Sequence, residues 1–316
     1  MVMRFLFRLA LACLMGMTLV LPAAAQQVWL VLAEEGGVHA EAAAVLQANL
    51  EGLTVTAGVG PALLGDKGEP PALIVTVGAA AFEETLNWLS GKRGSWERVP
   101  VLATLLPQAA YDGQVLRQAS GGAARRVLSA AVLDQPLGRQ MALLKRALPE
   151  RRRIGVLVGP QTRPQLPALG REAAARGLRV ATAPDVMVPD QLYPALRTAL
   201  EVSDVLLALP EPTVYNAATL QNILLTTYRA RLPLVAFSPA YVKAGAVLAV
   251  YSTPAQVARR AAEMVRSWQA GRGLPPPQMP REFAVAANAK VAASLGLMLD
   301  DAAVIAEDLR RQEGLQ

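Results

Sequence analysis

Several polar residues of this sequence directly follow apolar runs, which is where small-molecule sites of α/β proteins form. Glu34 and Glu35 come after the run 28–32, and a carboxylate there would pair with an amine or another cation of a ligand. A solvated turn explains these two residues equally well. Gly78 follows the run 73–77 and opens a helix, so backbone N–H groups there could hold an anion or a carbonyl group. Tight packing is the alternative reason for this glycine.

A second group of polar residues follows apolar runs in the second half of the chain. Glu211, Tyr215 and Asn216 lie between the run 205–209 and the next helical pattern, and this loop is the preferred candidate for ligand binding. Asn216 could instead cap its helix. Ser238 and Tyr241 follow the run 234–237, and the tyrosine offers both a ring face and a hydroxyl.

Three further positions have both a structural and a functional interpretation. Asp134 precedes Pro136 at the start of a helical pattern, so it is first a helix cap and second a candidate ligand contact. Tyr251 ends the run 246–251, where the chain is expected to cross between lobes, so a hinge or a pocket role fits it. His39 falls inside the first expected helix and is interpreted as an ordinary surface residue.

Composition excludes several classes of chemistry. Cys13 is the only cysteine and His39 the only histidine, which argues against disulfides, cysteine-ligated metals, multi-histidine zinc sites and most histidine-based hydrolases. We therefore expect neither an enzyme nor a cofactor. The net charge is +6, but the basic residues are scattered and aromatic residues make up 5% of the chain, so no nucleic-acid partner is expected.

Short β-rich apolar runs alternate with helical patterns along the chain. In the first half these runs are 28–32, 53–57, 73–77, 99–105 and 126–133. They lack polar alternation, which indicates parallel strands buried on both faces, and the helical patterns between them favour βαβ units.

The pattern restarts near Asp134 and gives a second series. Leu137, Met141, Leu144 and Leu148 form one apolar helical stripe, and further strands are expected at 154–158, 178–183, 205–209, 234–237, 246–251 and 283–287. Helices are expected at 164–176 and 216–229, and the proline-rich stretch 274–280 is expected to be an extended connector that joins no sheet. The fold class is therefore α/β, with two doubly wound parallel-sheet lobes joined by a hinge.

The first 25 residues have the three parts of a secretory signal peptide. Arg4 and Arg8 precede a short apolar run, and small residues stand before Gln26, so cleavage is expected after Ala25. The run is shorter than the roughly 20 residues that a membrane-spanning helix needs. An uncleaved anchor and lipidation at Cys13 are the weaker alternatives. The mature protein is expected in the periplasm.

A family resemblance rests on a series of motifs in the second half. These are the segments 204–216, 224–229, 232–238, 240–246, 251–254 and 283–296, in that order and spacing. The chain resembles the ABC-transporter substrate-binding family whose better-known members bind tryptophan or tyrosine, with the type I periplasmic binding protein fold. The resemblance is good over roughly residues 120 to 300 and extends to residues 28–120 by pattern alone.

The resemblance implies a cleft that closes on a small-molecule solute and delivers it to an ABC permease with a cytoplasmic ATPase. It matches Asp134 to an Asp at the lobe junction, and the segment 209–211 to a proline-containing loop. The pocket motifs depart from the family pattern. Glu211 stands in place of an Asp-Asn pair, the turn 158–162 is not rich in Ser and Asn, and 252–254 replaces a paired-Tyr turn. The resemblance therefore does not carry an aromatic amino acid over as the ligand.

The sequence thus predicts a periplasmic solute-binding protein of an ABC-type uptake system. Residues 1–25 are expected to be the signal peptide, 26–133 with about 252–272 to form lobe 1, and 134–251 with about 280–316 to form lobe 2. One alternative is a periplasmic ligand-sensing module for a membrane receptor. The other is an exported enzyme that uses Asp134 and Glu211 as a carboxylate pair within about 10 Å of each other.

Overall fold

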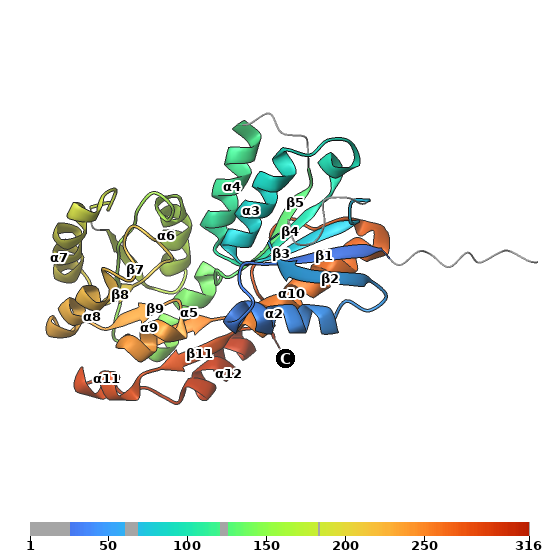
Figure 1. Cartoon of the computed structure of the whole chain (residues 1–316). Coiled ribbons are helices and arrows are strands. Elements are labelled where there is room, and N and C mark those ends of the chain that lie inside the picture. Colours follow the sequence, from blue (N-terminus) through green and yellow to red (C-terminus); the bar gives the residue numbers. More distant parts are fainter. Residues whose placement is uncertain (1–25, 61–68, 121–125, 183, 316) are drawn as a thin grey trace, which may run out of the picture.

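The computed structural model describes residues 26–60, 69–120, 126–182 and 184–315. The predicted signal peptide, residues 1–25, lies outside the described residues. The described chain forms two lobes side by side, each built on its own sheet (Figure 1).

The first lobe contains a five-stranded parallel sheet in the order β2-β1-β3-β4-β5. Its strands are β1 (Gln27–Leu32), β2 (Thr54–Val59), β3 (Leu73–Val77), β4 (Val101–Leu106) and β5 (Leu128–Val132). Every residue of β3 and β4 is buried, as expected for central strands covered on both faces, whereas the edge strand β2 is partly exposed.

Helices cover both faces of this sheet. One face is covered by α2 (Gly37–Ala48) and α10 (Pro254–Ser267), and the other by α3 (Ala79–Ser90) and α4 (Gln108–Ser120), with η2 (Gly94–Arg98) beside them. The helix α10 comes from late in the sequence and yet packs on α2, β4 and β5. Its first turn carries a capping box formed by Thr253 and Gln256.

The second lobe contains a six-stranded sheet in the order β11-β10-β9-β8-β6-β7. Its strands are β6 (Arg153–Val156), β7 (Arg179–Thr182), β8 (Val205–Leu207), β9 (Leu234–Ala236), β10 (Leu248–Tyr251) and β11 (Ala284–Ala287). All pairings are parallel except that of β10 with β11, which is antiparallel because the chain returns to this lobe from the opposite direction.

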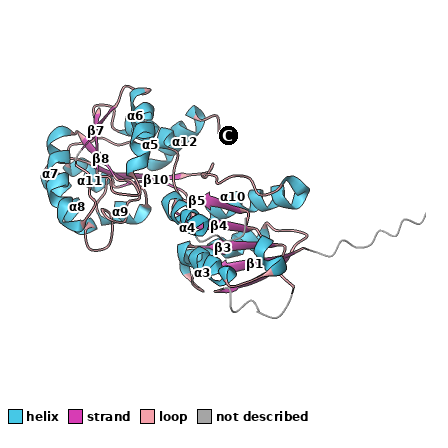
Figure 2. Cartoon of the chain, turned by 90° about the horizontal axis from the view of Figure 1, so that it is seen from above, coloured by secondary structure: helices cyan, strands magenta, loops and turns pink. Residues whose placement is uncertain are grey.

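The helices of the second lobe also form two layers. One contains α5 (Leu137–Ala147), α6 (Leu166–Ala174), α11 (Ala289–Ser294) and α12 (Ala302–Gln312); the other contains α7 (Leu192–Val202), α8 (Leu220–Arg229) and α9 (Pro239–Ala244). The short helical turns η3 (Arg163–Gln165) and η4 (Pro189–Gln191) also belong to this lobe, whereas η5 (Trp268–Arg272) continues α10 in the first lobe. Both sheets with helices on two faces confirm the predicted α/β class with two doubly wound lobes (Figure 2).

The chain crosses between the lobes three times. The crossings follow β5, follow β10, and precede β11. The third crossing corrects one expectation. One residue of the proline-rich stretch does pair with β5, in an isolated parallel bridge: Gln278 donates its N–H to Ala130 O at 2.8 Å and accepts from Val132 N–H at 3.0 Å. Gln278 follows the three prolines and keeps the backbone N–H that they lack.

The start of α5 corrects a second expectation. The stripe formed by Met141, Leu144 and Leu148 is buried as predicted, but α5 begins at Leu137 with Pro136 as its N-cap residue. Asp134 instead accepts a hydrogen bond of 2.6 Å from the N–H of Gln108, the first residue of α4. This aspartate therefore caps a helix of the first lobe rather than the helix that follows it in sequence.

Candidate functional site

A cleft of about 750 Å³ lies where the two lobes and the crossings meet. The first lobe contributes the loop after β4 and the first turns of α4, and the second lobe contributes the loops after β6, β8 and β9. Tyr251 at the end of β10, Leu133, Asp134 and Gln135 of the first crossing, Ser252 of the second and Met279 of the third also line it. The cleft thus stands at the carboxyl ends of parallel strands, where open α/β sheets hold their ligands. Its volume is within the usual range of small-molecule sites.

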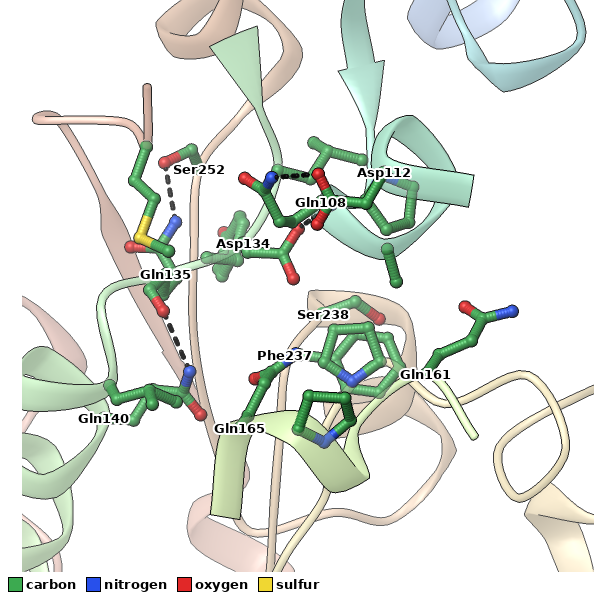
Figure 3. A pocket seen from close by; sticks show the side chains of 18 of the residues that line it. Gln108, Asp112, Asp134, Gln135, Gln140, Gln161, Gln165, Phe237, Ser238 and Ser252 are labelled. Atoms are coloured by element: carbon green, nitrogen blue, oxygen red, sulfur yellow. Dashed lines mark hydrogen bonds between the residues drawn. The ribbon is translucent and has the colours of Figure 1, made fainter. Parts of the chain in front are cut away.

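The first-lobe wall carries two carboxylates that share one partner. Gln108 donates its backbone N–H to Asp134 and its side-chain amide to Asp112 Oδ1 at 2.8 Å. Figure 3 shows the Asp134 carboxylate directed toward the space in front of Phe237 and Ser238, which belong to the opposite lobe. Burial raises the pKa of Asp134 above its usual value, and the neighbouring charge of Asp112 acts in the same direction, against the hydrogen bond from Gln108.

The backbone before α4 is irregular, which sets the position of this wall. The register between β4 and β5 shifts between Thr104 and Leu106, and Leu105 between them has a φ of 60°. A bulge of this kind bends its strand and turns the chain that follows. It places Pro107 and Gln108 at the cleft and leaves the Leu105 side chain in the core layer under α2 and α10.

The second-lobe wall is built on the loop between β6 and α6. Gln161 and Gln165 of this loop line the cleft. The loop is held from behind by Glu211, which is 1% exposed and accepts hydrogen bonds at 3.0 Å from the N–H groups of Gln161 and Thr162 and from the Thr162 hydroxyl. A buried carboxylate that accepts several hydrogen bonds fixes the backbone that donates them.

The base of the cleft is a hydrogen-bonded cluster that joins the crossings. Gln135 in the first crossing donates to Ser252 Oγ in the second at 2.9 Å, and Ser252 donates to the carbonyl oxygen of Glu282 in the third at 2.6 Å. Gln140 of α5 donates its amide to Gln135 O at 3.0 Å (Figure 3). Each crossing is therefore linked to the next by at least one side chain.

Three of the nine sequence-predicted ligand residues line this cleft: Asp134, Ser238 and Tyr251. The structure places Glu35 on the exposed turn before α2. Gly78 is buried and donates its N–H to Thr104 O. A Cβ added at this position would lie only 2.7 Å from His39 Nε2. The packing alternative therefore accounts for this glycine, and His39 is partly buried against it rather than an ordinary surface residue.

Three of the remaining predicted residues lie in the loop after β8 and Tyr241 lies in α9, and each makes its described contacts within the second lobe. Glu211 holds the β6–α6 loop, and Tyr215 is buried in the core. Asn216 accepts from the N–H groups of Ala218 and Thr219 in the turn before α8, whose N-cap residue is Thr219 rather than Asn216. Tyr241 donates to the carbonyl oxygen of Tyr215 at 3.3 Å. A ligand role for these four and for Glu35 and Gly78 stays a prediction.

The enzyme alternative required Asp134 and Glu211 on one cleft. Asp134 lines the cleft, but the Glu211 carboxylate accepts hydrogen bonds from the β6–α6 loop and does not line the cleft.

Five polar residues that line the cleft were not predicted from the sequence: Gln108, Asp112, Gln140, Gln161 and Gln165. Gln108 and Gln161 follow strand ends and so carried the same signal that selected the other candidates.

No helix in residues 26–60, 69–120, 126–182 and 184–315 is long and apolar enough to span a bilayer. Within the same ranges, no group of three or more His, Cys, Asp or Glu side chains is arranged to hold a metal ion.

Comparison with known proteins gives one family. The family described as "ABC transporter substrate binding protein" matches residues 132–308. No curated protein matches the chain.

Solved structures resemble most of the chain at low sequence identity. A ligand-free, open substrate-binding protein with adhesive properties from Clostridium difficile has a TM-score of 0.63 at 14% identity, covering 87% of this chain and 96% of its own. An ABC domain in complex with L-Trp from Streptococcus pneumonia has a TM-score of 0.58 at 13% identity, covering 90% and 98%. A conserved domain protein from Vibrio cholerae has a TM-score of 0.56 at 18% identity, covering 89% and 98%. At these identities the likeness is one of fold.

Proposed function

Since this chain belongs to the ABC transporter substrate-binding protein family, we propose that it binds a small solute in the interlobe cleft and delivers it to an ABC permease. The observation that carries this proposal is the cleft of about 750 Å³ lined from both lobes and from all three crossings. A ligand in such a cleft contacts both lobes at once. It would therefore favour a closed arrangement by its extra contacts there.

The cluster at the base of the cleft supports a hinge motion. The links from Gln135 to Ser252 and from Ser252 to Glu282 lie within the crossings, so the lobes can rotate while these hydrogen bonds persist. We propose residues 26–133 with about 252–272 as one moving body, and 134–251 with about 280–316 as the other. The packing of α10 on α2 and of α12 on β11 supports this division.

The proposed ligand contacts come from both sides of the cleft. Asp134, Ser238 and Tyr251 are retained from the sequence prediction, and Asp112 and Gln161 are added because they line the cleft. Glu211 is assigned to holding the Gln161 loop rather than to touching the solute.

We further propose that the protein works in the periplasm after removal of residues 1–25 and that it performs no chemistry on its solute. The basic, apolar and small-residue parts of the N-terminal segment support export. Its partners would be a membrane permease and the cytoplasmic ATPase of that transporter. If the protein serves transport, deleting the permease should abolish uptake of the solute. If it is a sensing module, the same deletion should leave uptake of the solute unchanged.

Solute binding is tested by a thermal-shift screen of the purified protein against amino acids, amines, purines, vitamins and small peptides. A solute present at 100 times its dissociation constant should add roughly 2.7 kcal/mol to the free energy of unfolding. X-ray scattering with the same solute should give a smaller radius of gyration. A saturating solute without compaction contradicts hinge closure, and a panel without any shift contradicts solute binding.

A further inference from the structure

The charged residues that line the cleft are all acidic among those that the structure describes. Asp112 and Asp134 are the two, and no Lys, Arg or His accompanies them. The whole chain, by contrast, has 31 basic and 25 acidic residues. The described lining of the cleft is therefore acidic, although the chain as a whole is basic.

The two carboxylates are held in place by neutral donors. Gln108 supplies its backbone N–H to Asp134 and its amide to Asp112, and in the described part of the chain neither carboxylate forms an ion pair. Their negative charge is therefore not neutralised within the protein. A bound cation would neutralise it and would gain charge-assisted hydrogen bonds.

The amide oxygen of a largely buried glutamine adds a third acceptor at the cleft. Gln140 is 8% exposed, and its amide nitrogen is committed to the carbonyl oxygen of Gln135, which fixes the oxygen as its free end. That oxygen accepts no hydrogen bond from the described residues, and the side chain lines the cleft (Figure 3). An acceptor that faces the cleft and has no partner in the described protein can accept a hydrogen bond from a ligand that brings a donor.

An anionic ligand would meet no compensating cation here. Arg139, which donates to Gln135 behind the cleft, also donates to Glu313 and to the carbonyl oxygen of Pro280, so its guanidinium is already occupied. The other polar side chains of the cleft, such as Gln161 and Ser238, are neutral. A solute with a free carboxylate would therefore be repelled by Asp112 and Asp134 without a counter-charge.

The walls around these acceptors are apolar. They include Leu116, Leu133, Leu137, Val250 and Met279, and Phe237 adds a ring that can face a cation. We propose that the solute is an organic cation, with an amine or ammonium nitrogen on an apolar body and no carboxylate, whose nitrogen lies against Asp112 and Asp134. This inference rests on the proposed function, because it specifies the solute of the same cleft.

A matched panel tests the charge directly. Hexyl, phenylethyl and indolylethyl skeletons, each as the amine, the alcohol and the carboxylic acid, are titrated by calorimetry at neutral pH. We expect each amine to bind at least about ten-fold more tightly than its alcohol, and each acid to bind most weakly, as one charge-assisted hydrogen bond predicts. Asp134→Asn should weaken amine binding by about 10- to 100-fold. Asp112 is exposed, so Asp112→Asn should weaken it by about two- to five-fold. The exposed Asp190→Asn is the matched control and should change nothing.

A second experiment does not depend on the carbon skeletons chosen for the panel. The protein is incubated with a small-molecule extract of bacterial cells and desalted, and the retained compounds are identified by mass spectrometry. Retained cations that Asp134→Asn fails to retain support the inference. Retained neutral or anionic solutes, acids that outrank amines, or affinities unchanged in both aspartate variants overturn it while solute binding stands. If nothing is retained and no panel member binds, the proposed function fails together with this inference.

Discussion

Asp134 is exposed to water in the unfolded chain and only partly exposed, at the cleft, in the folded protein. Burial is the main reason why its pKa rises above 3.8, with repulsion from Asp112 on α4 as a further contribution. The folded state therefore holds the Asp134 proton more tightly than the unfolded chain does. The stability that this adds is present below pH 3.8 and is lost as the pH rises through the raised pKa.

Asp134→Asn should remove this pH dependence. We expect the variant to match the wild-type protein near pH 3 and to become more stable than it as the pH rises to 7, measured as Tm in the absence of solute. Asp190→Asn, an exposed change of the same type, should show no such widening difference. A difference in Tm that stays constant over this range would contradict the buried, proton-binding role of Asp134.

Tyr215 has a buried hydroxyl without a hydrogen-bond partner among the described residues. Its ring packs in the core with Phe237 and Tyr241. Because an unpaired buried hydroxyl costs about 1–3 kcal/mol, Tyr215→Phe should raise the free energy of unfolding by about 1 kcal/mol. Tyr241→Phe should lower it by about 0.5–1.5 kcal/mol, because that hydroxyl donates to Tyr215 O.

Chemical denaturation measures both tyrosine variants. The solute affinity of Tyr215→Phe distinguishes a role of Tyr215 in the core from a role in ligand binding. Unchanged affinity supports the core role, whereas a loss of affinity would support the ligand role that the sequence predicted. A destabilised Tyr215→Phe would mean that the hydroxyl does have a partner.

The loop between β6 and α6 carries Gln161 to the cleft, and its shape depends on Gly159. A Cβ at this position would lie 2.7 Å from the Glu211 carboxyl carbon and 2.9 Å from Val186 O. Gly159→Ala should therefore displace Glu211 or the loop and lower the free energy of unfolding by about 1–3 kcal/mol. Solute affinity should fall as well, because Gln161 is hydrogen-bonded to the displaced carboxylate.

Gly170→Ala is the matched control on the following helix. Gly170 lies inside α6 with nothing within 4 Å of a Cβ, so alanine should stabilise the protein by about 0.5–1 kcal/mol. Both variants are measured by chemical denaturation. Equal effects of the two changes would show that the contact with Glu211 does not constrain the loop.

At the scale of the whole molecule, Arg139 ties the crossings to the C-terminal helix. Its side chain is 3% exposed and forms a bidentate ion pair with Glu313. It also donates to Gln135 and to the carbonyl oxygens of Pro280 and Arg281. The guanidinium carbon lies 4.1 Å from the ring centroid of Phe283. Removing one partner of a buried pair leaves the other groups unpaired.

Arg139→Ala should lower the free energy of unfolding by about 3–5 kcal/mol. A double-mutant cycle with Glu313→Ala should show a double variant less destabilised than the sum of the single variants. Arg153 and Asp204 provide the control, since they form a similar pair with the arginine side chain 56% exposed. Arg153→Ala should change stability by about 1 kcal/mol or less. Similar losses at both arginines would contradict a special role for the hinge pair.

The pattern of secondary structure was determined by the sequence itself. Strands buried on both faces need uninterrupted apolar runs, and the run 73–77 matches β3 at both ends. The restart near Asp134 likewise predicted the second sheet. Local spacing could not predict β11 as an antiparallel edge strand or the pairing of Gln278 beside β5, because both depend on where the chain returns.

The composition of the cleft was decided by tertiary structure. The sequence identified strand ends as the place of the site, and Asp134, Ser238 and Tyr251 do line the cleft. Which strand ends face each other depends on how the two lobes are set about three crossings, so α4 contributes to the cleft while Glu35 and Gly78 do not. Within a loop, the direction of each side chain depends on long-range contacts. Glu211 points inward because the N–H groups of a loop 50 residues earlier bind it, and no local pattern encodes that.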